Sequence, residues 1–199
     1  MPLQLPITCA ITSGATTART TPDDPEFAHV LRLVEAVVAT QVSFVQIREK
    51  ALTARVLYEL AKRAVSITRG TATRVLVNDR FDVARAAGAD GVHLPSNSLP
   101  AEVVREICGD DFVIGVSTHS LEEARTASKT GADFVVFGPV FATGSKKPQG
   151  LERLREVTSA LKGFPVVAIG GIDLNNAADC ARAGASGIAA IRLFNTDLK

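Results

Sequence analysis

The sequence has little of the aromatic or unbalanced charge that several classes of binding protein need. Aromatic residues make up 5% of the 199 residues and tryptophan is absent, which argues against a surface on which nucleic-acid bases stack. The 22 basic residues are balanced by 21 acidic ones, so the net charge is only +1. No basic stripe is therefore available for nucleic acid or an anionic membrane. We expect no nucleic-acid partner and no membrane partner.

Cysteine is also scarce, and its pattern excludes a disulfide framework. Cys9, Cys108 and Cys180 are odd in number, far apart, and form no CxxC pair, so we expect reduced core residues. The N-terminus lacks the basic stretch and long apolar run of a secretory signal, and no apolar run is long enough to span a bilayer. These observations predict a cytoplasmic protein, and the length predicts one domain over residues 1–199.

What the chain does contain is a regular alternation of short apolar runs and amphipathic segments. The runs are rich in Val and Ile, as expected of parallel strands buried on both faces. Amphipathic segments such as 53–68 and 121–129 predict helices, with Thr53 and Ser120 as their N-caps. Further helices are expected at 26–39 and 151–161. The eight expected strands are residues 7–12, 43–48, 74–78, 91–94, 113–117, 134–139, 165–170 and 187–192.

A weak internal repeat supports the alternation of helices and strands. Gly88, Gly131 and Gly184 each stand where a helix should end in a left-handed cap, just before a strand. The turn after the first strand has no GxGxxG pattern, which argues against an open, doubly wound sheet. We therefore predict an α/β fold: a compact, single-domain (β/α)8 barrel. Little chain follows the eighth strand, so its final helix is expected to be truncated or missing.

In such a barrel, functional residues gather at the C-terminal ends of the strands. Alternation along the second strand points Gln46, Arg48 and Lys50 the same way, toward the mouth or lumen. Cations and amide donors at one mouth of a nearly neutral chain predict an anionic ligand. His93 is as consistent with capping a backbone group as with chemistry. The other polar residues expected at this mouth are Asn78, Asp79, Ser117, His119, Thr143, Lys146 and Arg192.

Gly170 and Gly171 follow the seventh strand and favour a phosphate site. Glycines let the backbone approach a phosphate closely, and the loops after strands seven and eight are the common phosphate site of these barrels. A purely structural tight turn is the alternative explanation.

Six segments resemble, in order, the signature segments of the thiamine phosphate synthase and TenI family. Each segment is short, but together they extend over most of the chain and are highly specific. The resemblance implies a barrel enzyme of thiamine biosynthesis that binds a thiazole phosphate. The segments are residues 45–50, 78–80, 88–94, 114–119, 137–141 with Thr143 and Lys146, and 167–172.

The resemblance implies a role for most of the polar residues. A synthase of this family joins a hydroxymethylpyrimidine diphosphate to a thiazole phosphate and releases pyrophosphate. Ser117 and Thr143 would then lie near the reacting groups, and Gly170 and Gly171 would hold the thiazole phosphate. Asp79 would bind magnesium, if magnesium binds at all. The implied diphosphate or pyrimidine contacts are Gln46, Arg48, Lys50, Asn78 and Lys146.

Departures from the synthase pattern favour the TenI type. Ser98 stands where synthases carry a second magnesium carboxylate, and a neutral hydroxyl is a much poorer ligand for a hard dication. TenI-type proteins isomerise a thiazole carboxylate phosphate to its aromatic tautomer without metal, and their acid/base histidine matches His119. Arg192 replaces the usual serine-containing segment at strand eight and would supply a phosphate contact.

The leading interpretation is accordingly a thiazole tautomerase, with His119, Ser117 and Lys146 as catalytic residues. The alternative is the synthase, which the retained Gln46, Lys50 and Asp79 favour. Two further alternatives are a non-catalytic thiazole-phosphate binder or regulator and another phosphate-binding barrel isomerase. The expected partners are small phosphorylated molecules; a homo-oligomer is left open, and magnesium is the one cofactor considered.

Overall fold

The computed structural model describes residues 3–144 and 147–194 and shows the closed parallel barrel that the alternation predicts. All strands pair in chain order, and the last pairs with the first. The strand bounds lie close to the expected ones. They are β1 (Ile7–Ile11), β2 (Phe44–Ile47), β3 (Arg74–Asn78), β4 (Gly91–Leu94), β5 (Val113–Thr118), β6 (Phe134–Phe137), β7 (Val166–Ile169) and β8 (Gly187–Ala190).

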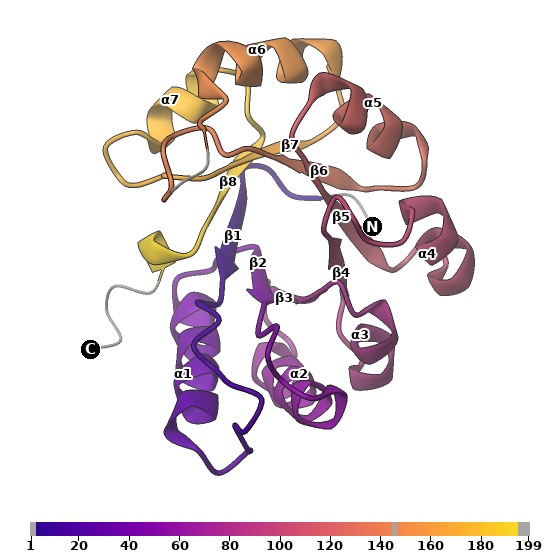
Figure 1. Cartoon of the computed structure of the whole chain (residues 1–199), viewed down its shortest axis with the longest axis vertical. Coiled ribbons are helices and arrows are strands. Elements are labelled where there is room, and N and C mark those ends of the chain that lie inside the picture. The colour runs from indigo at the N-terminus through magenta and orange to yellow at the C-terminus, as the bar shows by residue number, and fades with distance from the viewer. Residues whose placement is uncertain (1–2, 145–146, 195–199) are drawn as a thin grey trace.

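A helix follows each of the first seven strands and covers the outside of the barrel. In Figure 1, α1 to α3 lie on one side of the barrel and α5 to α7 on the opposite side. After β8 the described residues hold a 3-10 turn, η1 (Arg192–Phe194), and no eighth α-helix. The α-helices are α1 (Pro25–Ala39), α2 (Ala54–Thr68), α3 (Phe81–Ala87), α4 (Ala101–Cys108), α5 (Leu121–Lys129), α6 (Gly150–Ala160) and α7 (Ala177–Arg182).

The helix ends form as their sequences predict. The Thr53 side chain accepts a hydrogen bond from Val56 N–H, and Ser120 accepts one from Glu123 N–H. These caps satisfy backbone donors that have no partner inside the helix. Gly88 ends α3 in the left-handed region at φ +72°, a conformation that suits glycine because it has no Cβ.

Alternation along the strands divides the core into a lumen and an outer layer. The lower lumen is apolar: Phe44 and Phe134 stack there with ring centroids 5.6 Å apart, beside Ile7 and Cys9. Residues that point outward, such as Val45 and Val92, pack against the helices. All three cysteines are free and buried, as expected, and burial raises the pKa of Cys9 to about 12.

The base of the barrel is held by side chains at the start of the even-numbered strands. Asp90 Oδ2 accepts a hydrogen bond from Val75 N at 2.7 Å, and Asp133 Oδ2 accepts one from Ile114 N at 2.7 Å. Ser43 Oγ accepts from Thr8 N of β1 at 3.2 Å, and Ser186 Oγ accepts from Val166 N of β7 at 3.4 Å. The Gly-Ala-Asp/Ser repeat of the sequence therefore has a structural cause: it joins strands in pairs at their N-terminal ends.

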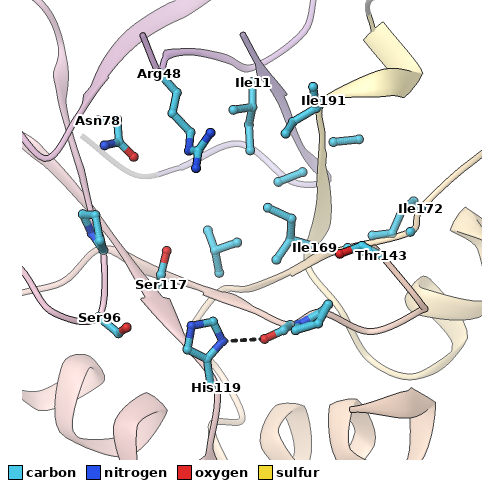
Figure 2. Close-up of a pocket in the computed structure, with 18 of the residues that line it drawn as sticks. Ile11, Arg48, Asn78, Ser96, Ser117, His119, Thr143, Ile169, Ile172 and Ile191 are labelled. Carbon is cyan, nitrogen blue, oxygen red and sulfur yellow. Dashed lines mark hydrogen bonds between the residues drawn. The ribbon is translucent and has the colours of Figure 1, made fainter. Parts of the chain in front are cut away.

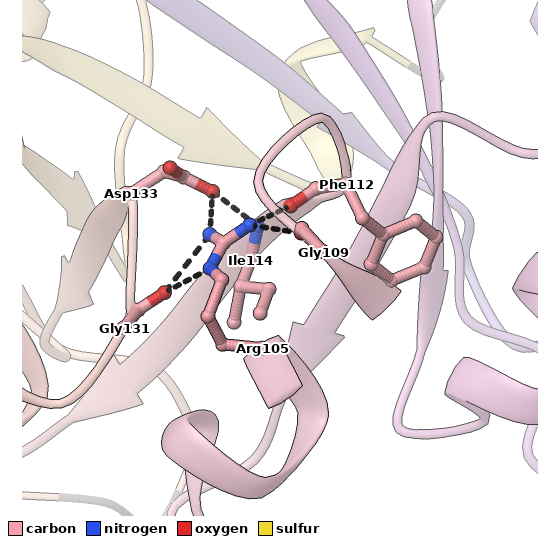
Figure 3. A network of polar contacts seen from close by, with 6 residues as sticks. All are labelled: Arg105, Gly109, Phe112, Ile114, Gly131 and Asp133. Atoms are coloured by element: carbon pink, nitrogen blue, oxygen red, sulfur yellow. Dashed lines mark hydrogen bonds and ion pairs between the residues drawn. The ribbon is translucent and has the colours of Figure 1, made fainter. Parts of the chain in front are cut away.

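Arg105 of α4 reinforces this base (Figure 3). Its guanidinium donates to the carbonyl oxygens of Gly109 and Phe112, both at 2.7 Å, and to that of Gly131. It also forms an ion pair with Asp133 at 2.7 Å. One side chain thus ties the loop before β5 to the loop before β6. Among the described residues, no helix is long and apolar enough to cross a membrane.

Candidate active site

A cavity of about 490 Å³ opens at the C-terminal ends of the strands, where the fold places functional groups. Its floor is the last inward-pointing residue of several strands, including Ile11 of β1, Ser117 of β5 and Ile169 of β7. Its walls are loops that follow the strands. Figure 2 shows that polar side chains gather on one side and isoleucines on the other.

The polar side comes from β2, β3 and β5. Arg48 and Lys50 both line the cavity, as the alternation along β2 predicts, and the half-buried Asn78 lies on the same side. Ser117 lies on this side too, between Asn78 and His119 in the view of Figure 2. Two cations and an amide gathered in a partly enclosed space favour an anionic ligand, because the low local dielectric strengthens their attraction for negative charge.

Glu49, between the two cations, points the other way and has a different task. It is 2% exposed. Its carboxylate accepts hydrogen bonds from the backbone N–H groups of Gly14 and Thr16 and from the Thr16 hydroxyl. It therefore anchors the loop between β1 and α1 next to the cavity and sets the position of the backbone that carries Arg48 and Lys50. The sequence analysis did not single out this role.

The opposite side of the cavity combines an apolar wall with a pair of glycines. Ile11, Ile169, Ile172 and Ile191 form the wall (Figure 2). Gly170 and Gly171 both line the cavity with positive φ, at +100° and +62°. Backbone N–H groups in such a turn form a concave site for an anion, and Thr143 and Arg192 line the same cavity.

The two glycines also leave no room for a side chain. A Cβ at Gly170 would lie 2.6 Å from Pro139 Cα, and one at Gly171 would lie 2.7 Å from the Ala142 carbonyl oxygen. The turn after β7 is therefore in close contact with the loop after β6. The purely structural explanation of this dipeptide and its role at a phosphate site are compatible, because the close packing is what brings both loops to the cavity.

His119 stands at the lower edge of the cavity in Figure 2 and is exposed. Its Nδ1 lies 2.6 Å from the Gly138 carbonyl oxygen, which can only accept, so Nδ1 carries the proton. In the neutral ring Nε2 is then an acceptor. Its backbone N–H donates to Glu123, which fixes its place before α5. The geometry suits proton transfer as well as ligand binding.

Gln46 lies beneath the cavity, which differs from the direct substrate contact expected from the sequence. It is 1% exposed and is not among the residues that line the cavity. Its Nε2 donates to Asn78 Oδ1 at 3.1 Å, and its Oε1 lies 2.8 Å from Nδ1 of His93. Its side chain therefore orients residues of the cavity floor.

His93 lies directly beneath the cavity, although the sequence pattern gave it no definite role. It is 3% exposed, and its Nε2 lies 2.8 Å from the Ser117 Oγ. Burial, followed by the nearby Arg48 charge, lowers its pKa to about 4, so the ring is neutral at physiological pH. Its inward position follows from the alternation that also places Gly91 inward, so the signal was present in the sequence.

Asp79 lies at the rim of the polar side, next to Asn78. It is exposed and adopts φ +67°, a left-handed conformation that Asp tolerates better than most residues. The Ser98 hydroxyl donates to Asp79 Oδ1 at 2.5 Å. Among the residues that the structure describes, no three His, Cys, Asp or Glu side chains gather into a metal site. One carboxylate beside an anion site is still a donor set that magnesium accepts together with substrate phosphates.

Lys146, expected to contact substrate and to act in catalysis, lies outside the described residues. The remaining expected site residues that line the cavity come from six of the strands or the loops that follow them. They are Arg48, Lys50, Asn78, Ser117, His119, Thr143, Gly170, Gly171 and Arg192.

Comparison with known proteins gives a consistent result. Residues 18–194 match the family model described as thiamine monophosphate synthase. The chain is 44% identical over 165 residues to the thiamine-phosphate synthase of Moorella thermoacetica, covering 81% of this chain and 78% of that protein. It is 42% identical over 172 residues to the corresponding enzyme of Clostridium novyi, covering 83% of this chain and 84% of that protein.

A solved structure agrees with these sequence relatives. The thiamine phosphate pyrophosphorylase from Pyrococcus furiosus superimposes with a TM-score of 0.78 at 36% identity, covering 96% of this chain and 89% of that one. These similarities favour the synthase alternative. They do not support the preference for a tautomerase, which depended mainly on Ser98 and the loop around it.

Proposed function

Because the chain belongs to the thiamine monophosphate synthase family, an enzyme family of thiamine biosynthesis, we propose that it catalyses the synthase reaction. In this reaction a hydroxymethylpyrimidine diphosphate and a thiazole phosphate give thiamine phosphate and pyrophosphate. One observation carries the proposal: a single cavity has two ends suited to anions, one at Arg48, Lys50 and Asn78 and one at Gly170 and Gly171. The synthase substrates supply a diphosphate for the end with two cations and a separate monophosphate for the other end. A tautomerase substrate carries one phosphate and one carboxylate, so it has no diphosphate that would need both Arg48 and Lys50.

The end at β2 and β3 would hold the diphosphate. Arg48 presents a planar fork of donors that matches phosphate oxygens, and Lys50 adds a point charge. Asn78 contributes amide N–H groups, because its Oδ1 is already engaged with Gln46. These groups stabilise the negative charge that grows on the departing pyrophosphate, which is where fixed donors lower a barrier most. Lys146 is proposed to act on the same charge.

The end at β7 and β8 would hold the thiazole phosphate. The turn at Gly170 and Gly171 offers backbone N–H groups, and Arg192 offers a guanidinium in place of the family's usual serine-containing segment. The apolar wall between the ends, with Ile11 and Ile169, would pack against the two rings and exclude water. Exclusion of water protects a reactive pyrimidine methylene group from hydrolysis.

In the reaction, the bond between the pyrimidine methylene carbon and the diphosphate oxygen breaks. A bond from that carbon to the thiazole nitrogen forms, and pyrophosphate leaves with the electron pair. Ser117 and Thr143 both line the cavity and would orient the reacting groups. No proton transfer is needed at the bond that forms, so positioning and charge neutralisation account for the catalysis.

Magnesium is proposed to bind together with the diphosphate. When bound, it neutralises phosphate charge and so helps pyrophosphate to depart. Asp79 would be its protein ligand, and Ser98 holds one oxygen of that carboxylate in place. With one carboxylate, the site depends on substrate oxygens for the rest of the coordination shell.

The deciding experiment supplies both synthase substrates with magnesium and measures thiamine phosphate and pyrophosphate. We expect equal amounts of the two products. Arg48→Ala should abolish most of the turnover, whereas Arg153→Ala, which removes an exposed arginine of α6, should not change it. If the protein converts the thiazole carboxylate phosphate to its aromatic tautomer but forms no thiamine phosphate, the tautomerase interpretation is correct. If the protein binds thiazole phosphate and catalyses neither reaction, it is a non-catalytic binder.

A further inference from the structure

A chain of four side chains crosses the barrel just below the cavity. Ser117 Oγ lies 2.8 Å from His93 Nε2, and His93 Nδ1 lies 2.8 Å from Gln46 Oε1. Gln46 Nε2 completes the chain by donating to Asn78 Oδ1 at 3.1 Å. The two ends, Ser117 and Asn78, line the cavity, whereas Gln46 and His93 are buried beneath it.

Each hydrogen bond determines the direction of the next. Since Gln46 donates to Asn78 through Nε2, its Oε1 faces His93 and accepts. The proton of the His93 ring is therefore on Nδ1, and in the neutral ring Nε2 can only accept. The Ser117 hydroxyl must then donate its proton downward to His93, so that only its lone pairs face the cavity.

The opposite direction conflicts with the charge of the cavity. It would require Asn78 to turn its carbonyl oxygen toward the ligand, at the end where Arg48 and Lys50 favour an anion. An oxygen lone pair facing a phosphate oxygen is repulsive, whereas an amide N–H is attractive. The direction from Ser117 to Asn78 is thus the one that the ligand also favours.

We propose that His93 is a positioning residue: it fixes Ser117 as a hydrogen-bond acceptor toward the cavity and couples it to the anion bound at Asn78. When an anionic oxygen accepts a proton from the Asn78 amide, every bond along the chain is strengthened, because hydrogen bonds in series polarise one another. Binding of the diphosphate would therefore make Ser117 a better acceptor for a donor group on the pyrimidine.

This inference rests on the proposed function for the identity of the ligand, but its first test does not. The chain has three histidines, His29, His93 and His119, so ¹⁵N-histidine spectra are simple to assign by substituting one at a time. The unaltered protein at neutral pH should show His93 as the neutral tautomer with its proton on Nδ1. A proton on Nε2, or on both nitrogens, would overturn the proposal whether or not the protein makes thiamine phosphate.

The coupling is tested with inorganic pyrophosphate and magnesium. Saturating pyrophosphate should shift the His93 nitrogen resonances, although the anion binds at the other end of the chain. Gln46→Met, which interrupts the chain without altering a residue that lines the cavity, should remove this shift while calorimetry still detects pyrophosphate. An unmoved His93 resonance in the saturated, unaltered protein would overturn the coupling. Failure of pyrophosphate to bind at all would instead count against the proposed function.

A matched pair of variants tests the consequence for substrate choice. His93→Gln can place a side-chain amide near the position of Nε2 and keep the bond to Ser117. His93→Asn keeps the amide near Nδ1 and loses that bond. The unaltered protein should prefer an amino-substituted pyrimidine diphosphate over its oxo analogue by about 10–100-fold in kcat/KM, the usual cost of an unmatched buried hydrogen bond.

We expect His93→Gln to retain most of this preference, and His93→Asn to lose it to the extent that Ser117→Ala does. A merely structural role for His93 predicts a different result: both variants would lose activity toward the two analogues equally. An unchanged preference in His93→Asn would therefore contradict the proposal.

Discussion

At the scale of single residues, His119 separates the two enzyme interpretations. Its Nδ1 is engaged with the Gly138 carbonyl oxygen, which leaves Nε2 as an acceptor beside the cavity. Asparagine can reproduce the bond to Gly138 but cannot exchange a proton near neutral pH. The substitution His119→Asn thus removes acid/base capacity and changes the local structure little.

We predict that His119→Asn lowers the rate of thiamine phosphate formation by less than about tenfold, because proton transfer is not the central step. Lys146→Ala should cost about 10²–10³-fold, the usual effect of removing one group that stabilises transition-state charge. Steady-state kinetics of both variants with both substrates checks this. If His119→Asn alone lowers the rate by ~10²-fold or more, acid/base catalysis is central and the tautomerase interpretation is favoured.

Ser98 is the residue at which this chain departs most clearly from the synthase pattern. Because Ser98 holds Asp79 Oδ1 without adding negative charge, we predict weak magnesium binding in the absence of pyrophosphate. Ser98→Asp should strengthen that binding by supplying a second carboxylate. Calorimetric titration with and without pyrophosphate measures the effect. Ser96→Asp, in the same loop but without a bond to Asp79, is the control, and tight magnesium binding by the unaltered protein would contradict the prediction.

At the scale of elements, the phosphate end depends on two loops in contact. Gly171 has φ +62°, and a Cβ there would lie 2.7 Å from the Ala142 carbonyl oxygen. A substitution at Gly171 therefore strains its own backbone and displaces the loop after β6. A side chain added at Gly171 would thus affect folding as well as the proposed phosphate site.

We predict that Gly171→Ala lowers the affinity for thiazole phosphate and reduces stability by more than about 1–2 kcal/mol, because the clash with the loop after β6 adds to the usual cost of a left-handed conformation with a Cβ. Gly163→Ala is the matched control, because Gly163 has φ +90°, an open surrounding and no place in the cavity. It should cost only the left-handed contribution, about 1–2 kcal/mol in urea unfolding, and leave the affinity unchanged. Equal affinities in the two variants would show that the assigned phosphate end is wrong.

At the scale of the whole molecule, stability and chemistry lie at opposite ends of the barrel. The base contains Asp90, Asp133 and Arg105 with partners that are backbone groups of neighbouring strands and loops. The mouth contains the cationic, amide and hydroxyl side chains that line the cavity. This division allows the base to be altered with little effect on the site, as expected for this fold.

We predict that Asp133→Asn destabilises the protein by about 1–3 kcal/mol, because it weakens charged hydrogen bonds to Arg105 and Ile114 N–H. Its kcat should stay unchanged. Glu156→Gln, which breaks an exposed ion pair on α6, should cost less than about 0.5 kcal/mol. Urea unfolding and the synthase assay measure the two effects. A large loss of kcat in a folded Asp133→Asn protein would contradict the separation of base and mouth.

The sequence by itself determined the order of elements, the closed barrel and most of the polar residues that line its mouth. Strand periodicity and the cap residues are local, so Arg48, Lys50 and Ser117 could be placed without coordinates. The family was also evident from ordered motifs. The comparisons do not support the preference for a tautomerase over a synthase, a preference that gave most weight to one substituted loop residue.

Only the tertiary structure decided which polar residues line the cavity and which lie beneath it. Gln46 and His93 both point inward by alternation, but the depth at which a side chain lies depends on the tilt and stagger of all the strands of a closed barrel. In the structure, Gln46 accordingly lies below the cavity, and His93 contacts Gln46 on one side and Ser117 on the other. Contacts between residues 24 or 47 positions apart in the chain are properties of the closed barrel, and no local pattern contains them.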